Sequence, residues 1–75
     1  MPGLPNLSGR QAARAFQRDG WELARQRGSH MILVKENSIA TLSVPDHKEV
    51  AKGTLRALIR ASGLSVDEFI VLTKK

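Results

Sequence analysis

Two histidines, His30 and His47, are the side chains of this sequence best suited to transfer protons near neutral pH. His30 directly follows a Gly-Ser pair and comes a few residues after Arg25 and Arg27. If the Gly-Ser pair forms a turn, a phosphate bound by either guanidinium would lie within reach of the imidazole. These residues indicate a nuclease site around His30, although an exposed turn histidine without a function explains them too.

His47 lies in a short polar segment, Val44-Pro45-Asp46-His47-Lys48, and is the second candidate. An auxiliary role in catalysis is one interpretation of it. The other is a loop histidine that hydrogen-bonds the backbone, which needs no substrate.

Lys52, Arg56 and Arg60 recur every four residues and form a basic stripe on a predicted helix. The start of that helix, at Gly53-Thr54, also offers free backbone N–H groups. The basic stripe and the N–H groups at the start of the helix could together bind two phosphates. The same pattern is typical of an ordinary exposed helix face, so phosphate binding and solvation explain it equally well.

Nothing in the sequence predicts a metal or a cofactor. The chain has no cysteine, which removes thiolate ligands and thiolate nucleophiles. Its acidic residues, among them Asp19, Glu22, Asp46 and Glu49, are scattered between basic ones without the clustered spacing of magnesium or zinc sites. A deep cofactor cavity would also use up most of the interior of so short a chain. We therefore expect a shallow site that works without a metal ion and without a cofactor.

Length and charge narrow down the class of protein and of partner. The 75 residues are about half of a usual domain, so we predict a single domain over 1–75. Twelve Lys and Arg against seven Asp and Glu give a net charge of +5, which attracts nucleic acid first and acidic proteins second. No stretch resembles a signal peptide or approaches the ~18 apolar residues of a membrane span, which predicts a cytoplasmic protein that does not enter a membrane.

Hydrophobic periodicity predicts a helix, three strands and two further helices. Ser8 and Gln11 form a capping box in front of an amphipathic helix, and Ser65 with Glu68 forms another near the end of the chain. Between them the period changes from 3.6 to 2 at Trp21, which indicates strands. The predicted elements are a loose leader at 1–7, a helix at 8–19, strands at 21–27, 29–36 and 38–44, a helix at 53–63, a short helix from 65, and a frayed end at 74–75.

A tight turn at Gly28 determines which side chains of the first two strands share a face, because cross-strand partners point the same way. One face carries Trp21, Leu23, Arg25, Arg27, His30, Ile32 and Val34. We expect the apolar members of this set to lie under the helices. The basic members should lie on the same face, at its end. The opposite face, with Met31 and Leu33, is then open to a partner. On the third strand, which stops at Pro45, the apolar set is Ala40, Leu42 and Val44.

The order helix, three antiparallel strands, helix and short helix predicts an α+β fold of two layers, with the helices on one face of the sheet. Helix, meander, helix is also the element order of the double-stranded RNA-binding domain. A fold alone assigns no function.

Three ordered motifs give the chain a resemblance to a known family. They are Arg25-Gln26-Arg27-Gly28-Ser29-His30, Val44-Pro45-Asp46-His47, and Lys52-Gly53-Thr54-Leu55 followed by Ile59 and Gly63. Taken together they resemble the HicA (YcfA-like) toxins of bacterial toxin–antitoxin systems, and the likeness runs from Ser8 to Phe69. The resemblance implies a fold like the double-stranded RNA-binding domain, an mRNA interferase activity independent of the ribosome, and neutralisation by a HicB-type antitoxin.

Within that resemblance, the catalytic histidine of the family's Gly-Ser-His motif falls on His30 and the glycine on Gly28. Many members have a second histidine directly after the first, where this chain has Met31. The resemblance thus implies an endoribonuclease with one catalytic histidine, His30, and with His47 as an auxiliary candidate. The predicted RNA-binding residues are Arg25, Arg27, Gly28, Ser29, Lys52, Arg56 and Arg60.

Two other functions remain as alternatives. A non-catalytic double-stranded RNA-binding module would use the basic stripe to read the RNA backbone, and His30 would only donate a hydrogen bond. A structural or interaction protein would bind another chain through the mixed sheet face and show no salt-dependent affinity for RNA. RNA cleavage separates the toxin from the binding module, and RNA affinity separates both from the interaction protein.

Overall fold

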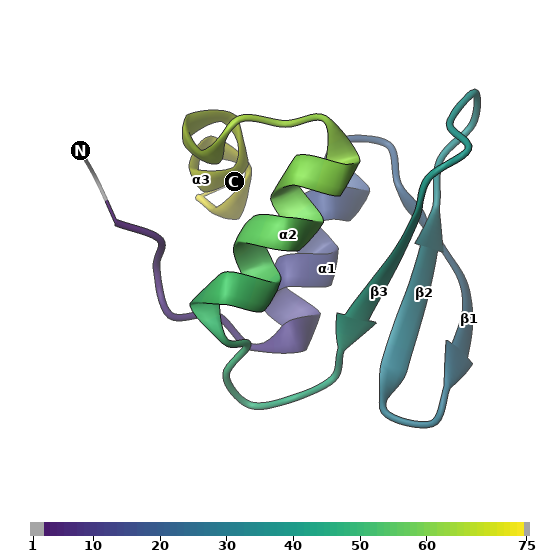
Figure 1. The fold of residues 1–75 in the computed structure, drawn as a ribbon, viewed down its shortest axis with the longest axis horizontal. Coiled ribbons are helices and arrows are strands. Elements are labelled where there is room, and N and C mark those ends of the chain that lie inside the picture. Colours follow the sequence, from purple (N-terminus) through teal and green to yellow (C-terminus); the bar gives the residue numbers. More distant parts are fainter. Residues whose placement is uncertain (1–2, 75) are drawn as a thin grey trace.

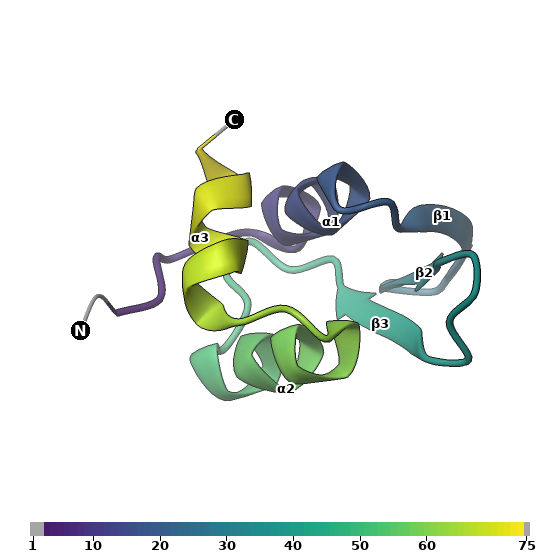
Figure 2. The same ribbon diagram turned by 90° about the horizontal axis from the view of Figure 1, so that it is seen from above.

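Helices and strands follow in the order α-β-β-β-α-α in the computed structural model, which describes residues 3–74 (Figure 1). The elements are α1 (Gly9–Arg18), β1 (Glu22–Arg27), β2 (His30–Val34), β3 (Thr41–Pro45), α2 (Lys52–Ser62) and α3 (Val66–Thr73). The strands pair antiparallel in the order β1-β2-β3, and the helices lie on one side of the sheet (Figure 2). The predicted α+β class is confirmed. None of the described helices is long and apolar enough to cross a membrane.

Helix α1 begins where the sequence predicts a capping box. The Ser8 hydroxyl accepts a hydrogen bond from the Gln11 N–H at 3.1 Å, and Gln11 Oε1 accepts one from the Ser8 N–H at 2.9 Å. The two bonds satisfy backbone donors that have no partner inside the helix. The apolar side of α1, with Ala12, Ala15 and Phe16, is fully buried, so the arginines of this helix face outwards.

Helix α3 begins with the second predicted capping box and completes the core. Its Phe69 ring is fully buried, with its centroid 4.9 Å from that of the Phe16 ring. The Arg18 guanidinium, at the end of α1, donates a hydrogen bond of 2.7 Å to the Leu72 carbonyl. The contact between α1 and α3 therefore combines apolar packing with a charge-assisted hydrogen bond near the C-terminal end of α3.

Trp21 connects α1 to the sheet. Its side chain is 2% exposed, as predicted, and its backbone N–H donates to the Phe16 carbonyl at 3.2 Å. The Lys35 ammonium lies 5.9 Å from the centre of the indole ring and pairs with Asp19 at 3.1 Å. The start of the sheet is therefore fixed to the end of α1 by both apolar and charged contacts.

The buried face of the sheet differs from the prediction. It is formed by Met31, Leu33, Leu42 and Val44, which are at most 6% exposed. The prediction that Ile32 and Val34 lie under the helices is wrong, because Ile32 is half-buried and Val34 is 38% exposed on the opposite, open face. Of the apolar set predicted on the third strand, Leu42 and Val44 are buried, whereas Ala40 is half-buried and lies just before β3.

A β-bulge at Ala24 explains the placement of the rest of β1. Between the turn and the bulge the pairing keeps the predicted shared face of the two strands, with Arg25 opposite Ile32. Beyond the bulge Leu23 pairs with Leu33, so Leu23 lies on the helix side. It is still 48% exposed there, because β1 forms the edge of the sheet.

The connection between β2 and β3 is longer than predicted, and both strands are shorter. The Ser38 N–H donates to the Lys35 carbonyl at 3.1 Å, and Asn37 has a positive φ of 66°, which asparagine tolerates better than most residues. Ile39 is fully exposed in this connection.

Part of the segment that we predicted as a loose leader, 1–7, packs against the fold. Leu4 and Leu7 are buried, and the Val50 N–H donates to the Leu7 carbonyl at 2.8 Å. Residues 1–2 of the leader and residue 75 of the predicted frayed end lie outside the described residues.

Candidate functional site

His30 is the first residue of β2 and lies on the open face of the sheet. Its side chain is exposed, and its cross-strand neighbours are Arg27 on β1 and Pro45 on β3. Directly opposed residues of antiparallel strands point to the same face, with Cβ atoms about 4.5–5.5 Å apart, so His30 and Arg27 are neighbours. We expected this pair to end the face under the helices, and the structure places it on the other face. Met31 follows His30 and points into the core.

Arg25 extends the same open face. It pairs with Ile32, two positions along β2 from His30, and every residue of β1 is exposed. The face thus carries two guanidinium groups and one imidazole with no described helix above them. This combination can bind a phosphate through the cations and transfer a proton through the imidazole.

The turn before His30 is attached to the segment that follows β3. Gly28 has a φ of 57°, which residues with a side chain rarely adopt and tight hairpin turns require. The Ser29 carbonyl accepts a hydrogen bond from the Asp46 N–H at 2.6 Å. The predicted turn is therefore confirmed, and Gly28 and Ser29 lie exposed beside His30.

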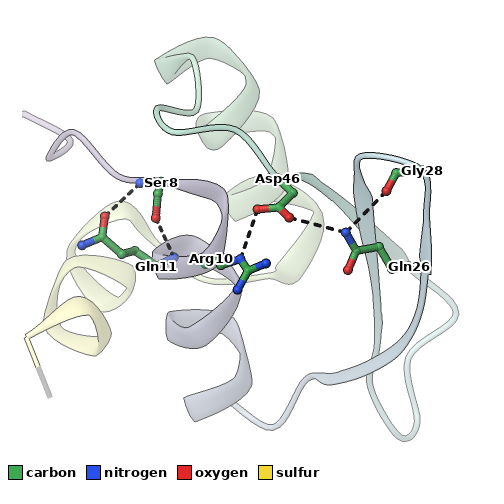
Figure 3. A network of polar contacts seen from close by, with 6 residues as sticks. All are labelled: Ser8, Arg10, Gln11, Gln26, Gly28 and Asp46. Atoms are coloured by element: carbon green, nitrogen blue, oxygen red, sulfur yellow. Dashed lines mark hydrogen bonds and ion pairs between the residues drawn. The ribbon is translucent and has the colours of Figure 1, made fainter.

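A polar network adjoins this hydrogen bond and contains residues that sequence reasoning missed (Figure 3). Asp46 Oδ1 lies 3.4 Å from Arg10 Nε, and Asp46 Oδ2 accepts a hydrogen bond of 3.4 Å from Gln26 Nε2. The same Gln26 nitrogen donates to the Gly28 carbonyl, also at 3.4 Å. Because Asp46 is 20 positions from Gln26 and 36 from Arg10, local sequence patterns carry no sign of the network.

His47 follows Asp46 in the loop between β3 and α2. Its side chain is exposed, and its carbonyl oxygen accepts a hydrogen bond from the Gly9 N–H at 2.8 Å. The loop lies at the same end of the molecule as the turn before His30, at the bottom of Figure 1. An auxiliary role for His47 stays a prediction. Among residues 3–74, no three His, Asp or Glu side chains form a group that could hold a metal ion.

The basic stripe of α2 does not share the face of His30. Arg56 and Arg60 line a groove of about 430 Å³ together with Leu4 and the start of α3, in the helix layer. Lys52 is exposed at the first residue of α2. The structure therefore brings Arg25 and Arg27 to His30 and leaves Arg56 and Arg60 on the helix side of the molecule.

Comparison with known families gives a match over most of this fold. The model of the family described as HicA toxin of bacterial toxin-antitoxin matches residues 9–64. The matched range begins with the first residue of α1, includes the whole sheet and ends just after α2, so α3 lies outside it. No curated protein matches the chain.

Proposed function

The chain belongs to the HicA toxin family of bacterial toxin–antitoxin systems, and we propose that it cleaves RNA with His30 as its catalytic residue. The observation that carries the proposal is the placement of an exposed His30 beside Arg27 on the open face of the sheet. An RNA strand can reach the imidazole there without any movement of the helices. The proposed target is mRNA in the cytoplasm, cleaved independently of the ribosome.

In the proposed reaction, His30 accepts the proton of a ribose 2′-OH while O2′ forms a bond to the adjacent phosphorus. The bond from phosphorus to the 5′ oxygen of the next nucleotide breaks, that oxygen takes up a proton from water, and the protonated His30 later returns its proton to the solvent. The products are a 2′,3′-cyclic phosphate and a 5′-OH end. Arg25 and Arg27 bind the phosphate and offset the negative charge that grows in the transition state. Proton transfer of this kind contributes about a hundred- to ten-thousandfold in rate, so we expect a slow nuclease.

RNA binding is expected to depend on charge rather than on base stacking. All three aromatic side chains of the chain are buried, namely Phe16, Trp21 and Phe69. No Phe, Tyr or Trp ring is therefore exposed for stacking on a base, and His30 and His47 carry the exposed aromatic rings of the described residues. Contacts to phosphates carry little sequence information, so we expect a weak preference for the sequence around the cleaved bond.

A HicB-type antitoxin is the proposed protein partner. We expect it to cover His30 and the neighbouring arginines, and the net charge of +5 favours a partner with an acidic surface. A purified complex of the two proteins should show no RNase activity. A complex that cleaves RNA as fast as the free chain would exclude inhibition by direct covering of the site.

The test is cleavage of an end-labelled RNA by the purified chain in the presence of a metal chelator. The wild type should cleave, and His30→Ala should not. Both should melt at the same temperature, because an exposed side chain contributes little to stability. His47→Ala tests the auxiliary candidate in the same assay: slower cleavage would support an auxiliary role, and unchanged cleavage would leave His30 as the single catalytic histidine. Full activity of His30→Ala would refute the assignment, and RNA binding without cleavage by the wild type would favour the non-catalytic module.

A further inference from the structure

The polar network around Asp46 lies directly behind the turn that carries His30. We propose that Gln26 and Asp46 are positioning residues, which hold the Gly28-Ser29 turn and thereby fix the orientation of His30. This inference rests on the proposed function, because the orientation of the imidazole matters only if it transfers a proton.

The turn has no packed side chain of its own to fix it. Every residue from 22 to 30 is exposed, and a Cβ at Gly28 would meet no described atom within 4 Å. The end of the hairpin therefore depends on hydrogen bonds for its position. The bonds that join it to another element run to Asp46, directly or through Gln26.

Both carbonyl groups of the turn are hydrogen-bonded to this pair of residues, the Ser29 carbonyl to the backbone of Asp46 and the Gly28 carbonyl to the side chain of Gln26. The Ser29 carbonyl accepts the Asp46 N–H at 2.6 Å, and the Gly28 carbonyl accepts the Gln26 amide, which also donates to the Asp46 carboxylate (Figure 3). The Ser29 carbonyl belongs to the peptide group that leads into His30. Fixing that peptide plane restricts the direction in which the imidazole leaves the backbone.

The network contacts the turn from the helix side. Gln26 pairs with Met31, a core residue, and lines a groove of about 260 Å³ between α1 and β1. Its neighbours Arg25 and Arg27 point to the open face. A change of Gln26 or Asp46 therefore leaves Arg25 and Arg27, which are proposed to bind the phosphate, in place on the open face, and it should lower kcat without raising KM.

The test measures steady-state RNA cleavage by Gln26→Ala, Gln26→Glu and Asp46→Ala. We expect kcat to fall roughly ten- to a hundredfold at unchanged KM, because a small misplacement of a catalytic group costs this much. Gln26→Glu keeps the size of the side chain but has no N–H to donate, so it should be as slow as Gln26→Ala. If Gln26 acted only by packing, Gln26→Glu would keep the wild-type kcat. Asp46→Asn retains an acceptor for Gln26 and should recover most of the kcat lost in Asp46→Ala.

Asp19→Ala is the matched control for Asp46→Ala. The side chains of Asp19 and Asp46 are 24% and 22% exposed, and each pairs with one cation, Lys35 at 3.1 Å and Arg10 at 3.4 Å. Asp19 lies at the opposite end of α1 from the turn. Its loss should lower the melting temperature about as much as the loss of Asp46, and leave kcat unchanged.

The outcomes separate this inference from the proposed function. Wild-type kcat in both Gln26 variants and in Asp46→Ala would overturn the positioning role, while an inactive His30→Ala would still support the nuclease. If the wild type does not cleave RNA, the proposed nuclease activity is itself refuted. Hydrogen exchange of the Asp46 N–H then tests whether Gln26 holds the turn, without any need for activity. Faster exchange in Gln26→Ala than in the wild type supports this role of Gln26, and unchanged exchange contradicts it.

Discussion

Gly9 and Pro45 approach each other so closely that only a hydrogen atom fits between them. A Cβ built on Gly9 would overlap the Pro45 carbonyl oxygen and lie 2.9 Å from the Cα of Asp46. The Gly9 N–H also donates to the His47 carbonyl. The first residue of α1 is thus fitted against the end of β3, directly beside the network that holds the turn of His30.

Gly9→Ala is therefore expected to destabilise the protein and to slow RNA cleavage. The added methyl group must displace the backbone at 45–46, and overpacking of this kind costs about 1–3 kcal/mol in the free energy of unfolding. Urea denaturation measures the loss. Gly53→Ala, in the first turn of α2, is the control, because a Cβ there meets no described atom within 4 Å and a helix accepts alanine at least as well as glycine. Equal stability of the two variants would contradict the close fit at Gly9.

Replacing Arg25 and Arg27 together by alanine should weaken RNA binding and its dependence on salt. Each phosphate contact to a single strand contributes about 0.7 to the slope of log affinity against log salt, so the slope should fall by about 1.4. Arg56→Ala with Arg60→Ala removes the same charge from the helix side and should change the slope far less. A larger effect of the α2 pair would place the RNA on the helix layer and favour the double-stranded RNA-binding module.

Met31→His should not speed up cleavage, although it introduces a second histidine directly after His30. The side chain at this position is 6% exposed and points into the core, away from the open face. A buried imidazole without partners is expected to lower the free energy of unfolding by about 1–3 kcal/mol. Thermal denaturation and the cleavage assay check both statements, with Ile32→His on the open face as the tolerated control. A stable and faster Met31→His protein would show that this position faces the substrate.

Local features of this fold could be predicted from the sequence. The capping boxes depend on residues three positions apart, and the shared face of Arg25, Arg27 and His30 follows from a two-residue turn and strict alternation. Neither feature needs knowledge of the rest of the chain.

The buried face and the positioning network could not be predicted in the same way. Ile32 and Val34 are as apolar as Met31 and Leu33, so alternation alone does not tell which pair the helices cover. The docking of the helices decides it, and docking depends on the whole chain. The contacts of Asp46 likewise join residues that only folding brings together.

Phe69→Ala should destabilise the protein strongly, although α3 lies outside the range matched by the family. The ring is fully buried against Phe16, and removing such a ring costs about 3–5 kcal/mol. Val71→Ala is the control on the same helix, since Val71 is 56% exposed and should change stability by about 0.5 kcal/mol or less. Similar urea midpoints for the two variants would mean that α3 is not an integral part of the core.

Acid should weaken the start of α3. The hydrogen bond from the Ser65 backbone N–H, followed by the contact with the Ser65 side chain, lowers the pKa of Glu68 below its usual value of 4.5. A carboxyl group with a lower pKa in the folded state stabilises the fold above its unfolded pKa, and this contribution is lost as the pH falls through the folded pKa. Glu68→Gln keeps an acceptor that does not titrate, so its melting temperature should fall less on acidification than that of the wild type. Parallel pH profiles would contradict this role of Glu68.

The buried position of Trp21 gives the protein an intrinsic optical signal. The chain has one tryptophan and no tyrosine, so its fluorescence reports on a single place, the junction between α1 and the sheet. Unfolding moves the indole into water and shifts its emission to longer wavelength, whereas a substitution on the open face leaves its surroundings unchanged. Emission spectra of unlabelled protein can therefore distinguish an unfolded variant from a folded variant that has lost only its catalytic activity.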